Sequence, residues 1–296
     1  MPASALALVI VAALLHASWN LMAKKSGGDH RFAFLTALGV TVLWAPAAWW
    51  FGAAELPRWG TAEWGVLGAS ALVHVAYYLT LLRGYREADL TVVYPVARGS
   101  APLVTVLAAV LLLGERLSFA AGLGVLAVCG GVFLIAGGPS LWRDVRGAHD
   151  AAARERVRAG LAWGSATGLL IAGYSVIDGY AVKAMAMGPV LFDYLGNVLR
   201  VPLQAPLVWR ERATLATVWR GQWKAVVAVS VMGPLAYMLV LYAVQMAPLS
   251  HVAPAREVSM LFAALIGGRL LGEADRGLRM AGALCIAAGV MALALG

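Results

Sequence analysis

Ten runs of mostly apolar residues, each about as long as a bilayer is thick, fill this sequence almost from end to end. They are continuously apolar rather than alternating, which favours membrane-spanning helices over a barrel. Hydrophobic residues make up 61% of the chain and charged residues 13%, whereas a soluble domain is about half apolar and about a quarter charged. The sequence therefore predicts an all-α membrane protein with ten transmembrane helices. These runs cover approximately residues 4–24, 32–53, 63–83, 90–113, 118–138, 160–182, 188–209, 225–245, 250–271 and 278–295.

The chain also contains an internal repeat. The stretch 88–138 recurs at the end as 247–296, and a shift of 158 residues places Ala97-Arg98 on Ala255-Arg256 and Gly114-Glu115 on Gly272-Glu273. We predict a first five-helix repeat at 1–138, a polar, arginine-rich linker with a short surface helix at 139–159, and a second five-helix repeat at 160–296. An odd number of spans in each repeat makes the second copy cross the membrane in the opposite sense, so the repeats are expected to be inverted.

Each repeat carries an arginine inside an apolar run. Arg98 has prolines on both sides, Pro95 and Pro102, so its helix is expected to be bent or broken nearby. Burying a guanidinium costs several kcal/mol unless it has a partner. No acid lies near Arg98 in its own segment, which leaves a distant helix, water or a bound anion, and we favour the anion. Arg256 is followed directly by Glu257.

Other polar residues inside the runs are candidates for contact with a solute, although several have structural explanations. A tryptophan near a helix end is normally an interfacial anchor, and a histidine inside the membrane can simply bond a neighbouring helix. Asp178 and Glu257 are candidates for proton coupling, with a structural ion pair as the alternative. The series Asp193, Asn197 and Arg200 follows one helical stripe and is expected to pair internally. The candidate solute-binding residues are Arg98, Arg256, Trp19, Asn20, His74, Tyr78, Tyr174 and Tyr237.

The sequence favours transport over catalysis. The histidines show no metal-ligand spacing, and the chain has no nucleophile elbow or phosphate loop, so we expect no catalytic residue, metal or cofactor. Cys129 and Cys285 lie in apolar runs and are read as buried thiols. The net charge of +8 is assigned to lipid headgroups rather than to nucleic acid. Transport of a small anionic or zwitterionic solute is the first hypothesis. The alternatives are a membrane-embedded enzyme acting on a lipid-linked substrate, and a scaffold.

These features together resemble the EamA branch of the drug/metabolite transporter superfamily over nearly the whole chain. The resemblance rests on the five-plus-five duplication, on Trp19-Asn20 with Lys24 at the end of the first run, on the Gly114-Glu115-Arg116 turn, and on the Ala-Pro-Ala-Arg-Glu-Val-Ser series at 253–259. One departure is the second turn, Gly-Glu-Ala at 272–274. The resemblance implies a multipass bacterial inner-membrane exporter or exchanger of amino acids and related metabolites. It also implies a central cavity between the third, fourth, eighth and ninth helices.

Partners and orientation follow less directly. We expect a small-molecule solute and membrane lipids as partners, proton coupling as an option, and a monomer or weak homodimer. The basic residues are concentrated in the loops on the side opposite to the termini, so the positive-inside rule favours both termini outside the cytoplasm. The resemblance implies the reverse, and the two expectations remain open.

Overall fold

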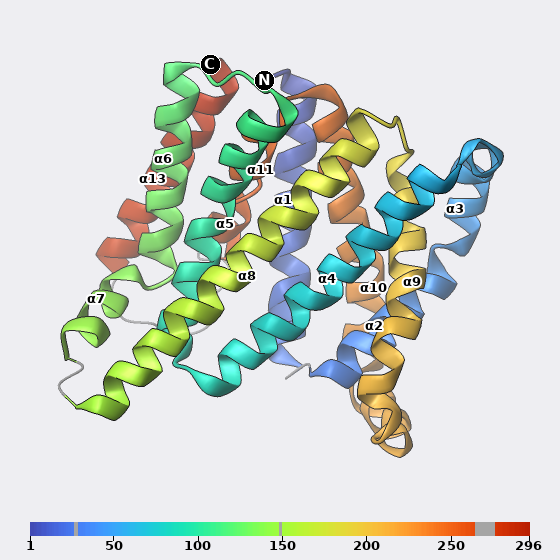
Figure 1. The fold of residues 1–296 in the computed structure, drawn as a ribbon, viewed down its shortest axis with the longest axis horizontal. Coiled ribbons are helices and arrows are strands. Elements are labelled where there is room, and N and C mark those ends of the chain that lie inside the picture. The colour runs from blue at the N-terminus through green and yellow to red at the C-terminus, as the bar shows by residue number, and fades with distance from the viewer. Residues whose placement is uncertain (27–28, 148–149, 264–275) are drawn as a thin grey trace.

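A computed structural model of the chain describes residues 1–26, 29–147, 150–263 and 276–296. Within those ranges the regular structure is helical and contains no strand (Figure 1), which confirms the predicted all-α class. Residues 258–263 are also helical. The elements are α1 (Ala3–Lys25), α2 (His30–Leu43), α3 (Ala45–Gly52), η1 (Ala53–Arg58), α4 (Thr61–Glu87), α5 (Leu90–Leu113), α6 (Phe119–Ile135), α7 (Gly138–Gly147), α8 (Ala151–Lys183), α9 (Pro189–Trp209), η2 (Arg212–Thr214), α10 (Leu215–Met246), α11 (Leu249–Ala255) and α13 (Arg276–Leu295).

Six helices of the described chain are long and apolar enough to cross a membrane, or seven if α2 and the helices after it form one bent span. This establishes a multipass membrane protein, while the count of ten remains a prediction. The segment predicted as one span at 32–53 is two helices that meet at Trp44, and the bent pair turns by 48°. Pro46 accounts for this, because proline lacks the N–H and crowds the carbonyl one turn earlier.

The prolines beside Arg98 do not break their helix, contrary to expectation. The α5 helix runs without interruption through Pro95 and Pro102, because neighbouring groups in a packed bundle can satisfy the freed carbonyls. The interruption lies instead in the predicted ninth span, where Arg256 and Glu257 form a turn between α11 and the helical residues 258–263. The rest of that span and Glu273 lie outside the described residues.

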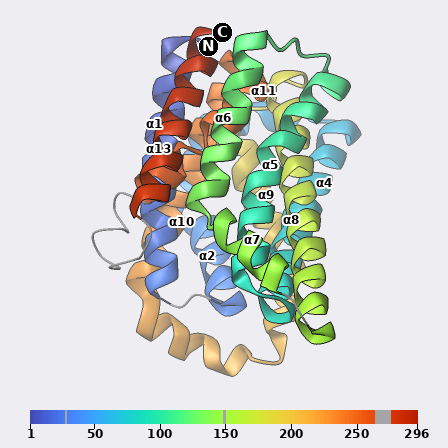
Figure 2. The same cartoon turned by 90° about the vertical axis from the view of Figure 1, so that its left-hand side faces the viewer.

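The chain runs back and forth between two ends of the molecule (Figures 1 and 2). The N- and C-termini lie at the same end, where α1 begins, whereas α8 begins at the opposite end. The α8 helix starts inside the region predicted as a linker, so only α7 and the few residues after it separate the two groups of helices.

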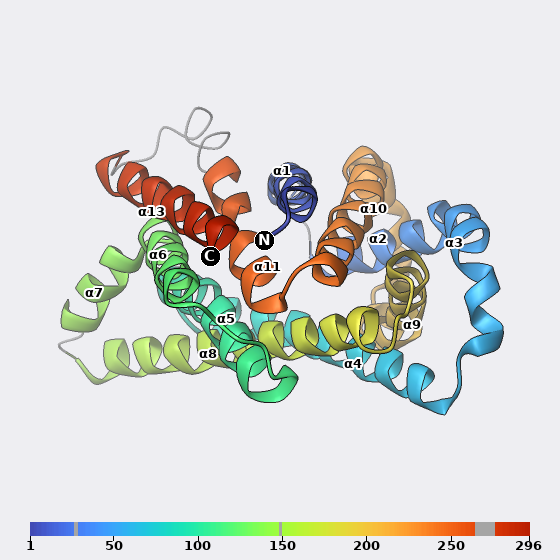
Figure 3. The same ribbon diagram turned by 90° about the horizontal axis from the view of Figure 1, so that it is seen from above.

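Helices from the two halves of the chain interleave rather than form separate bundles. The α5 and α4 helices pack on α8, α1 packs on α10, and α6 packs on α13. Seen from above, α11 lies among helices of both halves (Figure 3), and it contacts α1, α5, α6, α8, α10 and α13. The break after α11 therefore lies where both halves meet.

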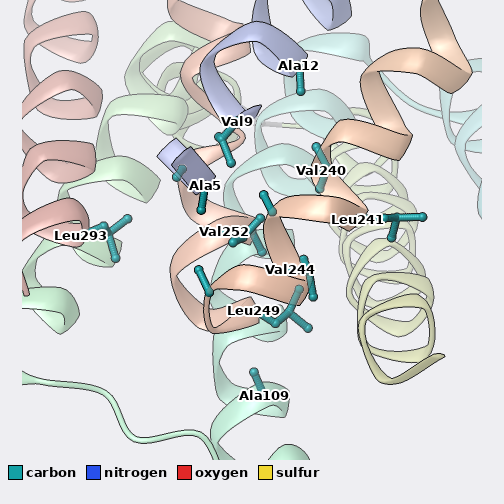
Figure 4. Close-up of a cluster of buried hydrophobic side chains, with 14 of the residues drawn as sticks. Ala5, Val9, Ala12, Ala109, Val240, Leu241, Val244, Leu249, Val252 and Leu293 are labelled. Atoms are coloured by element: carbon teal, nitrogen blue, oxygen red, sulfur yellow. The ribbon is translucent and has the colours of Figure 1, made fainter. Parts of the chain in front are cut away.

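Two features hold the end of the molecule that carries the termini. An apolar cluster joins α1, α10 and α11 through side chains such as Val9, Val244 and Val252 (Figure 4). At the same end, the amino group of Met1 donates a hydrogen bond of 2.9 Å to the carbonyl of Ala294. The cluster fixes α11 against α1 and thereby sets the position of the residues that follow it.

Candidate functional site

The two halves of the chain are joined by a buried ion pair. Arg98 lies eight residues into α5, about 12 Å from its start, and its Nη2 lies 2.8 Å from Oε2 of Glu257. The Glu257 side chain is 3% exposed and that of Arg98 is 20% exposed. Arg98 thus has a counter-charge from a distant part of the chain. Glu257 is poorly placed to pair with adjacent Arg256 because successive residues project in different directions.

Arg256, the repeat equivalent of Arg98, lies at the same junction but in a different state. It is partly buried, and its guanidinium interacts electrostatically with Arg98, Glu257, Tyr174 and Tyr237. Among the residues that the structure describes, Arg256 forms no ion pair. Its backbone N–H donates to the carbonyl of Val252 and so ends the last turn of α11. The turn places Arg256 beside the Arg98–Glu257 pair, in which Nε of Arg98 is itself buried without a hydrogen-bond partner.

A second buried acid, Asp178 of α8, lies among helices from both halves. Its side chain accepts hydrogen bonds from Ser70 Oγ of α4 at 2.5 Å and from the Tyr237 hydroxyl of α10. The Nε2 atom of His74 on α4 lies 3.8 Å from Oδ2 of Asp178. Asp178 is 1% exposed, and these donors satisfy a group that would otherwise be costly to bury.

Aromatic rings connect Asp178 with the arginines. His74 stacks on Tyr174 with 4.0 Å between ring centroids and lies edge-on to Tyr237 at 6.0 Å. Tyr77 lies edge-on to Tyr174 at 5.7 Å. Tyr174 and Tyr237 both interact electrostatically with Arg256, which also interacts with Arg98. The structure thus brings together Arg98, on α5, with six other predicted solute-binding and proton-coupling residues from α4, α8, α10 and the turn after α11. These are His74, Tyr174, Tyr237, Arg256, Asp178 and Glu257.

The other predicted residues are placed differently. Asn20 is exposed, and its amide donates back to the carbonyl of His16 at 2.8 Å. Tyr78 interacts electrostatically with Asp29, near the end of α1. Trp19 packs against a small apolar cluster that includes Phe32. Neither the hydrogen bond of Asn20 nor the interaction of Tyr78 with Asp29 involves Arg98 or Arg256.

Sequence reasoning missed three residues at this site. His16 contacts the edge of Trp19 at 4.9 Å and interacts electrostatically with both Arg98 and Arg256, while Ser70 and Tyr77 complete the contacts of Asp178 and Tyr174. Each lies one helical turn from a residue that was predicted, since Ser70 and Tyr77 flank His74 and His16 precedes Trp19. The spacing of three to four residues could have identified them.

Hydrogen bonds of Glu115 connect the turn after α5 with the start of α11. Its carboxylate accepts hydrogen bonds of 2.8 Å from the N–H groups of Leu249 and Ser250 and lies 3.6 Å from Lys183 Nζ. Burial alone would raise the pKa of the Glu115 carboxyl, but the Ser250 and Leu249 hydrogen bonds, with Lys183, outweigh it and hold that pKa below its ordinary value. Glu115 thus accepts hydrogen bonds from the first two N–H groups of α11.

No group of three or more His, Cys, Asp or Glu side chains that could hold a metal occurs in the described parts of the chain. The arrangement is instead one of cations, carboxylates and aromatic rings. Such a set can bind a charged organic molecule by ion pairing and by contact between a cation and a ring face.

Comparison with known proteins agrees with this architecture. One solved crystal structure is similar over 100% of this chain and 98% of its own, with a TM-score of 0.72 and 20% sequence identity, which shows a shared fold. No curated protein matches the sequence. The EamA-like transporter family matches twice, at residues 3–137 and 158–295. Two matches that divide the chain into an N-terminal and a C-terminal half, and together span most of it, are the duplication read from the sequence, and the chain belongs to the EamA-like transporter family.

Proposed function

We propose that this protein is a secondary transporter, an exporter or exchanger, of a small zwitterionic or anionic metabolite such as an amino acid. We place it in the bacterial inner membrane. The family is one of transporters, which favours transport over the alternative, an enzyme that acts on a lipid-linked substrate.

The observation that carries the proposal is the contrast between the two arginines. Arg98 has Glu257 as its counter-charge, whereas Arg256 lies beside that pair and forms no ion pair in the described structure. A guanidinium inside a membrane needs an anion, and the carboxylate of a solute supplies one. Glu257 pairs with Arg98 through Oε2, so its other oxygen and the rings of Tyr174 and Tyr237 can contact an ammonium group, which favours a zwitterion.

The location of this site supports alternating access. It takes Arg98 and His74 from helices before α7, and Asp178, Tyr237 and Arg256 from helices after it. The two matched segments begin at opposite ends of the molecule (Figure 1), which is the arrangement of inverted repeats. Rocking of one repeat against the other would expose a site between them to each side in turn.

The test is counterflow into liposomes that contain the purified protein. Liposomes loaded with a mixture of unlabelled standard amino acids are diluted into the same amino acids in labelled form, one at a time. We expect at least one label to accumulate with the unaltered protein and with Arg220→Ala, which changes an exposed arginine of α10. Arg256→Ala should remove the accumulation. Equal accumulation with Arg256→Ala, or none above protein-free liposomes, would contradict the proposal.

A further inference from the structure

A second set of buried polar residues lies along one face of α9. Asp193, Asn197, Arg200 and Gln204 follow one another at intervals of four, three and four residues, which places them on a single stripe. Asp193 is 4% exposed, and Asn197 and Gln204 are each 9% exposed. The stripe therefore faces protein.

The residues of this stripe pair with one another, as expected, but Arg200 and Asp193 form no ion pair in the described structure. Arg200 donates to Oδ1 of Asn197 at 3.3 Å rather than pairing with Asp193, and Asn197 donates to the backbone carbonyl of Asp193 at 2.8 Å. Oδ2 of Asp193, Nε of Arg200 and Oε1 of Gln204 are buried without a hydrogen-bond partner. Arg200 thus bonds Asn197, which is nearer to it along the helix than Asp193 is.

The surroundings of Asp193 contain one cation and a second acid. Arg200 interacts electrostatically with Asp193, with Asp178 on α8 and with His74 on α4. Tyr237, on α10, donates to Asp178. The α2 and α3 helices, which also pack on α9, carry no charged side chain from 32 to 52. Asp193 and Asp178 thus both interact with the Arg200 guanidinium, and Asp178 also interacts with Arg256.

These two acids differ in how they are satisfied. Asp178 has hydroxyl donors on both oxygens, from Ser70 and Tyr237, which suits a carboxylate. Asp193 has an oxygen with no donor, and an unpaired carboxylate in an apolar interior is far more costly than a neutral acid. Like charges that share a site also disfavour double ionisation.

We propose that Asp193 is a proton-binding site, in which a proton from water forms an O–H bond at Oδ2 and is later released to water. Asp178 remains the ionised partner of Ser70 and Tyr237. The part of the proposal that makes this proton the coupling ion rests on the proposed transport function. The binding of the proton itself does not, so it is tested without any solute.

Infrared spectroscopy of the protein in liposomes, titrated over pH, detects the carbonyl stretch of a protonated carboxylic acid. We expect a buried acid band near neutral pH that is lost in Asp193→Asn and retained in Asp178→Asn. A band that persists unchanged in Asp193→Asn, that is absent from the unaltered protein, or that is lost in Asp178→Asn instead would overturn the assignment.

A second variant keeps the test decisive if Asp193→Asn does not fold. Removing the positive charge in Arg200→Gln disfavours ionisation of Asp193, so the acid band should persist to higher pH than in the unaltered protein. Arg220→Ala, which removes an exposed arginine from α10, should leave the titration unchanged. A titration that is unaltered or moved to lower pH in Arg200→Gln would contradict the proposal.

Discussion

At the scale of single residues, the buried Arg98–Glu257 pair is expected to contribute to the stability of the fold as well as to the site. Breaking a buried ion pair by removing one member costs about 3–5 kcal/mol, because the other charge stays buried without a partner. We therefore expect Arg98→Ala to lower the free energy of unfolding by about that amount, since Glu257 is almost fully buried. Denaturant unfolding of the detergent-purified protein measures it.

A double variant separates the charge from the packing. Arg98→Met combined with Glu257→Met replaces the pair by apolar side chains of similar length, which is often neutral for stability. The double variant should regain most of the loss in Arg98→Ala yet remain inactive in counterflow. A double variant less stable than Arg98→Ala would show that the pair does not act as a unit.

Glu115 makes stability depend on pH. Its pKa is lower in the folded protein than its ordinary value, so its contribution to stability is complete above the pKa of the unfolded chain, about 4.3, and is lost as the pH falls through the folded pKa. The unfolding temperature of the protein should fall as the pH drops below about 4.3, and by less in Glu115→Gln.

The control for this prediction is Glu155→Gln, which changes an exposed carboxylate of α8. It should retain the full acid sensitivity of the unaltered protein. If Glu115→Gln and Glu155→Gln respond to acid identically, the carboxylate at the start of α11 is not the group responsible.

At the scale of elements, α6 and α13 pack with their backbones in close approach. A Cβ atom at Gly131 would lie 2.5 Å from the carbonyl oxygen of Gly282, and one at Gly289 would lie 2.6 Å from that of Gly124. Small residues that allow such approach are typical of helix contacts in membranes, where van der Waals packing drives association. The two glycine pairs hold together the last helices of the two matched segments.

Neighbouring glycines provide a matched test of this contact. Gly131→Ala places a methyl group against the Gly282 backbone and should lower the unfolding temperature. Gly130→Ala, where a Cβ meets nothing within 4 Å, should leave it unchanged or raise it, because alanine favours helix more than glycine does. Equal unfolding temperatures in the two variants would rule out the close contact.

The sequence predicted the helices better than their interruptions. The bounds of α5 match the predicted run because an apolar stretch ends at Gly114, which takes the left-handed conformation at φ 67°. Prolines alone did not identify the breaks, since Pro46 and Pro254 lie next to breaks whereas α5 continues through two prolines. Whether a proline breaks a helix depends on neighbours that satisfy the freed carbonyls, and those neighbours come from distant parts of the chain.

For the site, too, the sequence predicted some features and not others. Individual buried charges were evident because ionisable residues are rare in apolar runs. Their pairing was not evident. Arg98 and Glu257 are far apart in sequence, and Asp193 and Asn197 lie on the same helical stripe as Arg200, which bonds the nearer Asn197. Periodicity places side chains on a face, whereas the choice between neighbours on that face depends on side-chain geometry.

At the scale of the whole molecule, charge predicts orientation. The end opposite to the termini carries the start of α8 and the turn at η2 (Figure 1), both rich in arginine. The positive-inside rule predicts that this end faces the cytoplasm. A reporter active only outside the cytoplasm should be active when fused at Gly296 and inactive when fused after Thr214. The reverse pattern would show that the charge bias does not set the orientation.

The central claim is that a solute carboxylate binds Arg256 beside the Arg98–Glu257 pair. Its most direct test is a thermal-shift screen of individual amino acids on the detergent-purified protein, because a ligand that binds the folded state raises the unfolding temperature. The account predicts that at least one amino acid stabilises the unaltered protein and not Arg256→Ala. An amino acid that stabilises both proteins equally would contradict it, because its carboxylate would then bind elsewhere.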